Sequence, residues 1–250
     1  MAGHSKWANI KRRKDIVDSK RAKVFTKLVR EVSISARIGG GNPDGNARLR
    51  LAIDKARAQS VPKDRIEKAI QKAAGSNAEN NIEETTYEGY GPGGVAILVD
   101  AATDNKNRTV SEIRTTFTRH GGNLGESGSV GWMFEKKGIL RLPSEVISED
   151  ALIDKALTAG AEDITTADGL HTITTSFSDF HHLKESLEAQ KLEFRDDSGI
   201  EMIPKNLVSV TDEDMAKKLM SLVDALEDLD DVQHVWANFD LNDALLEKLS

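Results

Sequence analysis

The sequence contains no cysteine, and this single absence removes several kinds of chemistry. Disulfide bonds, cysteine-ligated zinc, iron–sulfur clusters and thiol catalysis are all excluded. A chain without disulfides suits a reducing compartment, so we expect a cytoplasmic protein.

Long hydrophobic runs are also missing. The longest strongly apolar stretch, Val95 to Val99, is far shorter than the ~20 residues that a bilayer-spanning helix needs. The first residues carry charges where a secretory signal would be apolar, so we expect neither export nor a membrane partner. Because 38% of the 250 residues are hydrophobic, the chain can still build the core of one large domain or of two to three small ones.

Aromatic residues are scarce, at 5% of the chain, and residues 1–80 contain only Trp7 and Phe25. Stacking on unpaired bases normally uses several exposed aromatic side chains, so Trp7 is the lone stacking candidate here, and a core position suits it equally well. The six histidines show no zinc spacing, and the sequence shows no recognisable constellation of a nucleophile and a base. We expect no metal, no cofactor and no catalysis.

Positive charge is abundant in the first third of the chain. Residues 1–80 carry 19 Lys and Arg against 8 Asp and Glu, whereas residues 81–250 carry 15 against 33. A basic block of this length is attracted to polyphosphate whatever its fold. The alternative is that these cations only form a solvated helical surface. The density of cations between Lys6 and Arg30 favours a nucleic-acid partner. The predicted contacts are Lys6, Lys11, Arg12, Arg13, Lys14, Lys20, Arg21, Lys23, Lys27, Arg30, Arg48 and Arg50.

Three helices are predicted in this basic third. A glycine-rich loop over residues 39–45 and Pro62, at the first position of a helix, separate them, and Gly75 ends the last one. On the helix from about Ser19 to Ile38, apolar residues and cations fall on opposite sides, with two exceptions: Arg21 lies on the apolar side and Ile34 lies among the cations. The pattern predicts that one face packs and the other offers charge.

The remaining sequence alternates between strand and helix patterns. We predict an α+β fold, in which a basic three-helix domain (1–80) precedes two ferredoxin-like α/β domains. A split domain (81–136 and 205–250) holds an inserted domain (137–204). The expected strands are 94–101, 128–134, 138–142, 171–176, 200–203, 206–210 and 232–239, and the expected helices are 107–119, 148–159, 180–190 and 212–229.

A glycine-rich segment, Gly89 to Gly94, resembles a phosphate-binding loop at first sight. It precedes a strand instead of following one, and it lacks the Gly-Lys-Ser/Thr ending. A tight turn is the better interpretation. Because exposed glycines let a backbone approach another molecule closely, the turn is also a candidate contact loop for a partner. Its residues are Tyr90, Gly91, Pro92 and Gly93.

Several motifs together resemble one known family. They are Ala2-Gly3-His4-Ser5-Lys6-Trp7-Ala8-Asn9-Ile10-Lys11, Lys20-Arg21-Ala22-Lys23, Gly39-Gly40-Gly41-Asn42-Pro43, Asn46-Ala47-Arg48-Leu49-Arg50, Tyr87-Glu88-Gly89-Tyr90-Gly91-Pro92-Gly93-Gly94-Val95-Ala96, Asp104-Asn105-Lys106-Asn107-Arg108-Thr109 and Gly121-Gly122-Asn123-Leu124-Gly125. In this order they resemble the YebC/PmpR family over essentially the whole chain. Residues 144–197 match that family in pattern alone.

The resemblance implies three domains and a regulatory role in nucleic-acid binding. Bacterial members of the family are commonly described as DNA-binding transcriptional regulators. Mitochondrial relatives are translational activators, and some bacterial members are linked to ribosomes stalled on proline-rich sequences. We therefore expect a DNA-binding regulator, with an RNA- or ribosome-associated translation factor as the alternative. A protein adaptor that uses the acidic domains is a third possibility. The sequence leaves the oligomeric state open, and a monomer is the default expectation.

Overall fold

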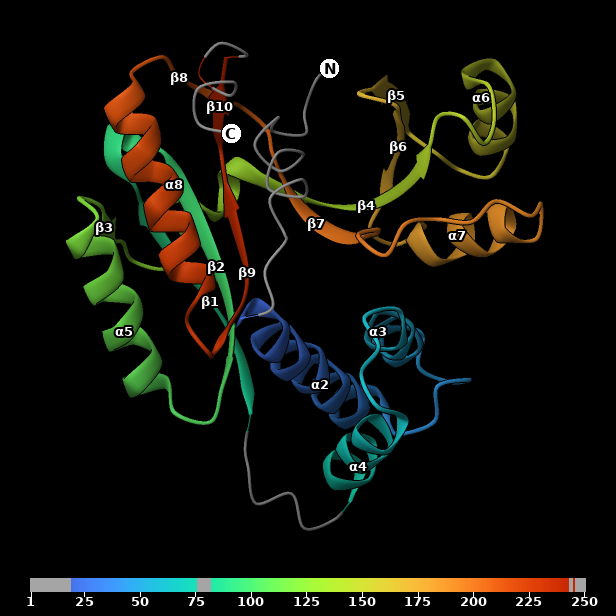
Figure 1. The fold of residues 1–250 in the computed structure, drawn as a ribbon, viewed down its shortest axis with the longest axis horizontal. Coiled ribbons are helices and arrows are strands. Elements are labelled where there is room, and N and C mark those ends of the chain that lie inside the picture. Colours follow the sequence, from blue (N-terminus) through green and yellow to red (C-terminus); the bar gives the residue numbers. More distant parts are fainter. Residues whose placement is uncertain (1–18, 76–81, 243–244, 246–250) are drawn as a thin grey trace. The chain divides into compact units, whose positions relative to one another are not determined.

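The structure, a computed structural model, describes residues 19–75, 82–242 and 245, with the backbone alone for residues 19–23. Contacts divide the chain into two compact units. One is Phe134–Lys205, and the other contains the remaining described residues. Each unit has a four-stranded antiparallel sheet of its own (Figure 1). The fold class is therefore α+β, as the sequence predicted.

The larger unit begins with a bundle of three helices whose core is made of small apolar side chains. Val32 of the first helix, Leu49 and Ala52 of the second and Ile66 of the third are buried together. Asn46 fixes the turn between the first two helices, because its amide group donates to Ser35 O at 2.7 Å and its side-chain oxygen accepts from Leu49 N at 3.0 Å. The helices are α2 (Ser19–Gly39), α3 (Ala47–Ala58) and α4 (Lys63–Ala74).

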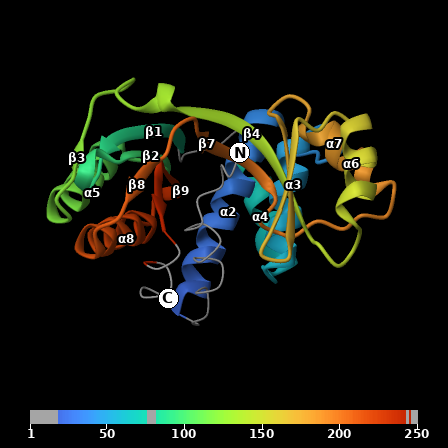
Figure 2. The same cartoon turned by 90° about the horizontal axis from the view of Figure 1, so that it is seen from above.

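The sheet of this unit has the strand order β3-β1-β2-β9, and all its pairs are antiparallel. Alternate residues of β2 point to one face, where Ile97 meets Phe117 of α5 and Leu219 of α8 in a shared core. Figures 1 and 2 show both helices on that side of the sheet. The elements are β1 (Glu83–Tyr90), the short 3-10 turn η1 (Pro92–Gly94), β2 (Ala96–Thr103), α5 (Lys106–Arg119), β3 (Asn123–Leu124), η2 (Gly131–Met133), α8 (Glu213–Glu227) and β9 (Val232–Ala237).

One predicted strand is absent and one unpredicted strand is present around Glu88. Its carboxylate accepts hydrogen bonds from the backbone N–H groups of Gly128, Val130 and Gly131, at 2.6–2.7 Å. Those N–H groups are unavailable to a strand ladder, so the strand predicted over 128–134 is instead a turn followed by η2. Glu88 itself belongs to β1, an acid-rich strand that the sequence did not reveal.

A third difference concerns the last strands of this unit. The segment predicted as the strand 206–210 was expected to join the split sheet. It forms β8 (Val208–Val210), which pairs in parallel with β10 (Phe239–Leu241) in a separate two-stranded sheet. Phe239 and Leu241 are buried in the same core as α8, so this small sheet closes one end of that core.

The smaller unit follows the order β-α-β-β-α-β of a ferredoxin-like fold. Its sheet has the order β5-β6-β4-β7, and α6 and α7 lie on one side of it (Figure 2). Leu152 of α6, Ile173 of β6 and Phe180 of α7 are fully buried. The sequence missed β5, whose residues are mostly exposed. The elements are β4 (Phe134–Pro143), α6 (Glu149–Thr158), β5 (Asp163–Ala167), β6 (Leu170–Ser176), α7 (Phe180–Glu188) and β7 (Gly199–Pro204).

Candidate nucleic-acid interface

Most of the predicted phosphate contacts lie at the start of the chain. Lys6, Lys11, Arg12, Arg13 and Lys14 fall outside the described residues. The backbone of α2 includes Lys20, Arg21 and Lys23, but their side chains are not described. These eight residues therefore stay predictions.

Lys27 and Arg30 of α2 are engaged inside the protein. The Lys27 ammonium donates to the backbone oxygen of Glu227 at 2.6 Å. The Arg30 guanidinium donates to the backbone oxygen of Asp230 at 2.6 Å and to the carboxylate of Asp231 at 3.0 Å. The middle of the α2 face that was expected to offer free charge is thus packed, and Ile34 there is only 3% exposed, whereas Arg37 near the end of the helix is exposed. The prediction that this face offers its charge is therefore wrong for Lys27 and Arg30.

Asp231 is the centre of this contact, and its side chain is 4% exposed. Besides Arg30, it accepts hydrogen bonds from Arg108 at 2.7 Å, from Thr109 at 2.7 Å and from Thr103 at 3.0 Å. Burial by itself raises the pKa of Asp231, but the hydrogen bonds from these residues outweigh that effect and hold the pKa below its usual value. Asp231 is therefore a charged hub that ties α2 and α5 to the start of β9.

Arg48 is also held by acidic side chains. Its guanidinium donates to Glu31 at 2.9 and 3.2 Å and to Glu84 at 2.5 and 2.9 Å. The hydrogen bonds to Glu84 are the largest cause that raises the pKa of Arg48, so the group stays charged. Arg50 is exposed, and it donates to the backbone oxygens of Pro43 and Asp44. Of these two predicted contacts, Arg50 keeps the more accessible guanidinium.

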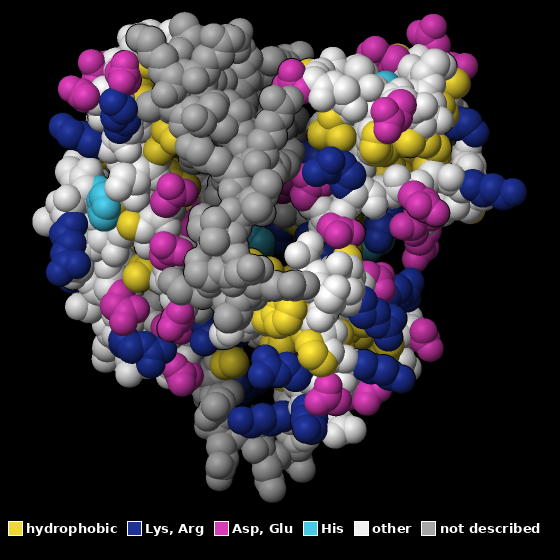
Figure 3. Space-filling view, in the orientation of Figure 1, with side chains coloured by type: hydrophobic (Ala, Val, Ile, Leu, Met, Phe, Trp, Pro, Cys, Tyr) yellow, Lys and Arg dark blue, Asp and Glu magenta, His cyan; other side chains and the backbone are white. Residues whose placement is uncertain are grey.

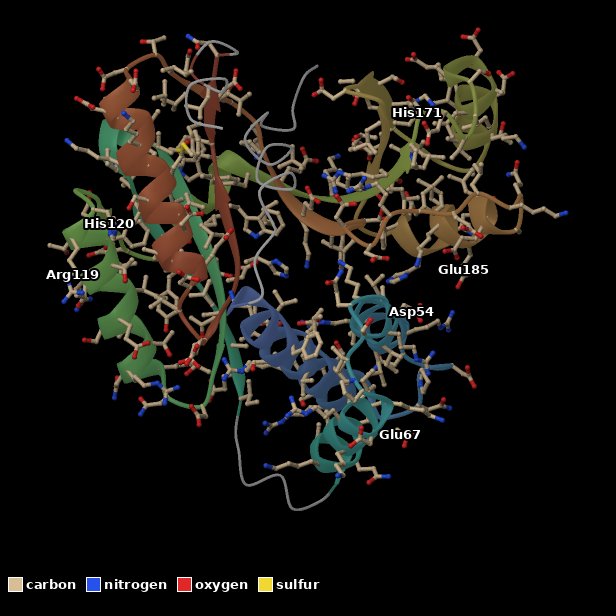
Figure 4. All side chains as sticks on the ribbon, in the orientation of Figure 1. Asp54, Glu67, Arg119, His120, His171 and Glu185 are labelled. Atoms are coloured by element: carbon tan, nitrogen blue, oxygen red, sulfur yellow. The ribbon has the colours of Figure 1, made fainter. Side chains whose placement is uncertain are left out.

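A set of cations on α3 and α4 remains exposed, and Figure 3 shows Lys and Arg side chains gathered over these two helices. Lys63 and Lys68 lie 3.5 and 3.9 Å from acidic neighbours one helical turn away, and such exposed pairs contribute little to stability. The sequence suggested their outward position through helical periodicity but gave no reason to rank them above the cations of α2. The exposed set is Arg57, Lys63, Arg65, Lys68 and Lys72. Asp54, Asp64 and Glu67 are exposed acidic side chains among these cations, and Figure 4 labels Asp54 and Glu67.

The glycine-rich turn packs closely on its own domain. The Tyr90 hydroxyl donates to the backbone oxygen of Ser129 at 3.0 Å. A Cβ atom on Gly91 would lie 2.9 Å from the side chain of Leu219, and one on Gly93 would lie 2.6 Å from the sulfur of Met215. Gly93 also has a φ of 73°, which favours glycine. Internal packing and turn geometry thus account for these glycines. A partner at Tyr90, Gly91, Pro92 or Gly93 stays a prediction.

The described residues hold neither a cluster of metal ligands nor a membrane-spanning helix. They contain no group of three or more His, Asp or Glu side chains placed to hold a metal ion. None of their helices is both long and apolar enough to cross a bilayer.

Comparison with known proteins decides the family. Residues 5–76 match the family model described as the TACO1/YebC protein N-terminal domain, and residues 82–239 match the one described as the TACO1/YebC second and third domain. The chain belongs to the TACO1/YebC family. The resemblance to YebC seen in the motifs is therefore confirmed.

Relatives of this TACO1/YebC chain match it along its whole length. A protein of Fusobacterium nucleatum is 52% identical over 249 residues, with all of both chains covered, and its name is "Probable transcriptional regulatory protein". A protein of Syntrophus aciditrophicus with the same name is 49% identical over 251 residues, again with full coverage. These names describe a family of regulatory proteins.

A solved structure shares the fold of this chain. The crystal structure of a conserved hypothetical protein from Aquifex aeolicus superposes with a TM-score of 0.84 at 45% sequence identity. The match covers 92% of this chain and 94% of that one. The TACO1/YebC architecture therefore extends over nearly all of the chain.

Proposed function

We propose that this TACO1/YebC protein is a transcriptional regulator that binds duplex DNA through its basic helical domain. The observation that carries the proposal is the segregation of charge, with 19 cations against 8 acids in residues 1–80 and the reverse excess in the rest. A basic domain attached to an acidic one orients toward a polyanion, because the acidic part is repelled from it. The relatives' name, which refers to transcription, supports DNA as that polyanion.

The contacts fall into two groups in this proposal. The first comprises the cations before α2 and in its first turns, from Lys6 to Lys23. The second comprises Arg50 and the exposed cations of α3 and α4, of which Arg65, Lys68 and Lys72 follow each other at intervals of three and four residues along one helix. Lys27, Arg30 and Arg48 contribute less, because carboxylates or carbonyl groups of the protein already hold their charges.

The binding is dominated by phosphates and includes no catalytic step. Phosphate contacts position a protein on a duplex without reading its sequence. Since nothing singles out an Arg, Asn or Gln aimed at base edges, the proposal assigns no base readout. We place this activity in the cytoplasm, where bacterial DNA is accessible.

The test is the salt dependence of binding to a DNA duplex of about 20 base pairs. If about six phosphates are engaged, the logarithm of the association constant falls with the logarithm of the salt concentration at a slope of about −5. Replacing Arg65, Lys68 and Lys72 by Gln removes three charges and lowers the steepness by roughly 2 to 3. The matched control replaces Lys191, Lys217 and Lys218, three exposed cations outside the helical domain, and leaves the slope nearly unchanged.

An RNA duplex of the same sequence is the second probe. Tighter binding to RNA than to DNA, with a steeper salt dependence, would overturn the choice of DNA and support a translation factor. A flat salt dependence with both probes would overturn nucleic-acid binding altogether and favour an adaptor.

A further inference from the structure

Helix α5 concentrates positive charge within the acidic split domain. All four Lys and Arg residues between residues 82 and 133 lie on this helix. Two of them are used inside the protein, since Lys106 pairs with Glu83 at 2.5 Å and Arg108 pairs with Asp104 and Asp231. The other two, Arg114 and Arg119, are exposed, and neither forms an ion pair with any residue that the structure describes. They are therefore available to an external anion.

The exposed face of α5 is also rich in neutral polar groups. The buried face is formed by Thr109, Ile113 and Phe117, and the opposite side is exposed. Asn107, Ser111 and Arg114 follow each other at intervals of four and three residues on that exposed side, so they form a row along the helix.

Arg119 ends the neighbouring row, after Glu112 and Thr115. Figure 4 shows it on α5, next to His120, directed away from the sheet, and Figure 3 shows Lys and Arg side chains along the same edge of the unit. Arg119 lies about 7.5 Å further along the helix axis than Arg114 and about 140° around it, so the two guanidinium groups border the exposed face on its two sides.

The hydroxyl groups on this face are not equivalent. Thr115 and Thr118 donate their protons to backbone oxygens of the preceding turn, at 2.8 and 2.9 Å, so in this structure they cannot donate to a phosphate. The free donors are the two guanidinium groups, the Asn107 amide and the Ser111 hydroxyl. Arginine, asparagine and serine side chains are among the usual partners of DNA phosphates.

We propose that the exposed face of α5 is a second contact surface for the sugar–phosphate backbone of duplex DNA. Charge complementarity supports this occupant, and the proposal rests on the DNA-binding function proposed above. A protein partner fits less well, because interfaces between proteins are anchored by large apolar side chains. Among the described residues, the exposed large hydrophobic side chains all lie outside α5. The acid on this face is Glu112.

The experiment compares two charge-matched variants of the full chain in binding to the same DNA duplex of about 20 base pairs. Arg114→Gln with Arg119→Gln removes two charges from α5, and Lys217→Gln with Lys218→Gln removes two from α8 of the same domain. The α5 variant is expected to lose about 1.8 in the steepness of the salt dependence, and the α8 variant less than about 0.3. Circular dichroism confirms that both variants are folded.

Glu112→Gln keeps the test valid if the α5 variant does not fold. It removes the exposed acid from the same face and is expected to tighten binding about twofold, a gain that unfolding cannot produce. The proposal is overturned if Glu112→Gln leaves the affinity unchanged, if the α5 and α8 variants behave alike, or if the α5 variant loses affinity for an RNA duplex alone. In each of these cases a loss of binding in the Arg65, Lys68 and Lys72 variant would still uphold the helical domain as the DNA-binding part. Absence of salt-dependent binding by the unmodified protein would overturn both proposals.

Discussion

At the scale of single residues, buried acids explain most of what the sequence did not show. Glu88 lies on a strand but gives its carboxylate to three backbone N–H groups of a distant turn. Asp231 is buried and accepts from two arginines that come from different helices. A sequence pattern treats an acidic residue as a solvated one, because the donors that satisfy these carboxylates come from elsewhere in the chain.

Asp231→Asn is expected to destabilise the protein by about 2–3 kcal/mol. The substitution removes the charge-assisted hydrogen bonds to Arg30 and Arg108, and the cost is moderated because those two side chains are 22% and 44% exposed and can regain water. Chemical denaturation monitored by circular dichroism measures the change. Asp230→Asn is the matched control, since only the backbone oxygen of Asp230 accepts from Arg30. Equal losses in the two variants would contradict a special role for Asp231.

The same comparison has a defined pH dependence. The pKa of Asp231 is lower in the folded protein than in the unfolded chain, so its contribution to stability is complete above the unfolded value of about 3.9. As the pH falls through the folded pKa, the carboxylate is protonated and that contribution disappears. The difference in stability between the unmodified protein and Asp231→Asn is therefore expected to be constant above about pH 5 and to shrink below about pH 4.

At the scale of elements, periodicity located most of the long helices, and pairing with distant groups decided the strands. The helix predicted over 212–229 is α8, and its residues Leu219, Leu222 and Leu226, spaced by three and four positions, are fully buried. The helix predicted over 107–119 is α5, within one residue at its start. In contrast, the sequence did not predict β1, because this strand is rich in acidic residues. Their carboxylates are held by Lys106, by Arg48 and by backbone N–H groups of a turn, and none of these partners lies close to β1 in the sequence.

The α2 helix shows the same limit for the candidate site. Its alternation of apolar and cationic sides was correct as a pattern, but the cationic side meets acceptor groups between residues 227 and 231. Lys27 and Arg30 of α2 are held by a segment about 200 positions later in the chain, whereas the cations of α4 stay exposed. The sequence could therefore predict that the domain is basic, but it could not predict which of its cations are accessible.

Gly89→Ala is expected to destabilise the protein by about 1–3 kcal/mol. A Cβ atom at this position in β1 would lie 2.7 Å from the backbone oxygen of Asn123 and 2.8 Å from the ring of Phe117 in α5, so β3 or α5 must shift. Thermal unfolding measures the loss. Gly45→Ala is the matched control, because the nearest atom to its Cβ is 4.0 Å away. A Gly89→Ala protein as stable as Gly45→Ala would show that α5 is free to move off the sheet.

At the scale of the whole molecule, the two classes of cation in the helical domain have different uses. Lys27 and Arg30 connect the helices to the acidic domain, whereas the α4 cations are solvated. The net charge of −7 hides this division, because most acids lie after residue 80 and some of them hold cations from before it. Stability and polyanion binding are therefore expected to depend on different basic residues.

Two double variants with equal loss of charge test this separation. Lys27→Gln with Arg30→Gln is expected to lower the stability by about 2 kcal/mol, since it removes hydrogen bonds to Glu227, Ala102, Asp230 and Asp231, and to leave the slope of the salt dependence of DNA binding within about 0.5 of the unmodified protein. Lys68→Gln with Lys72→Gln is expected to keep the stability and to lower the steepness by about 1.8. Denaturant titration and fluorescence anisotropy at several salt concentrations measure the two quantities on the same samples. The opposite result would be a Lys27 and Arg30 variant whose salt dependence of DNA binding falls by about 1.8 while its stability is unchanged. It would mean that these side chains leave residues 227–231 to contact DNA, and that the cations of α2 belong to the binding surface.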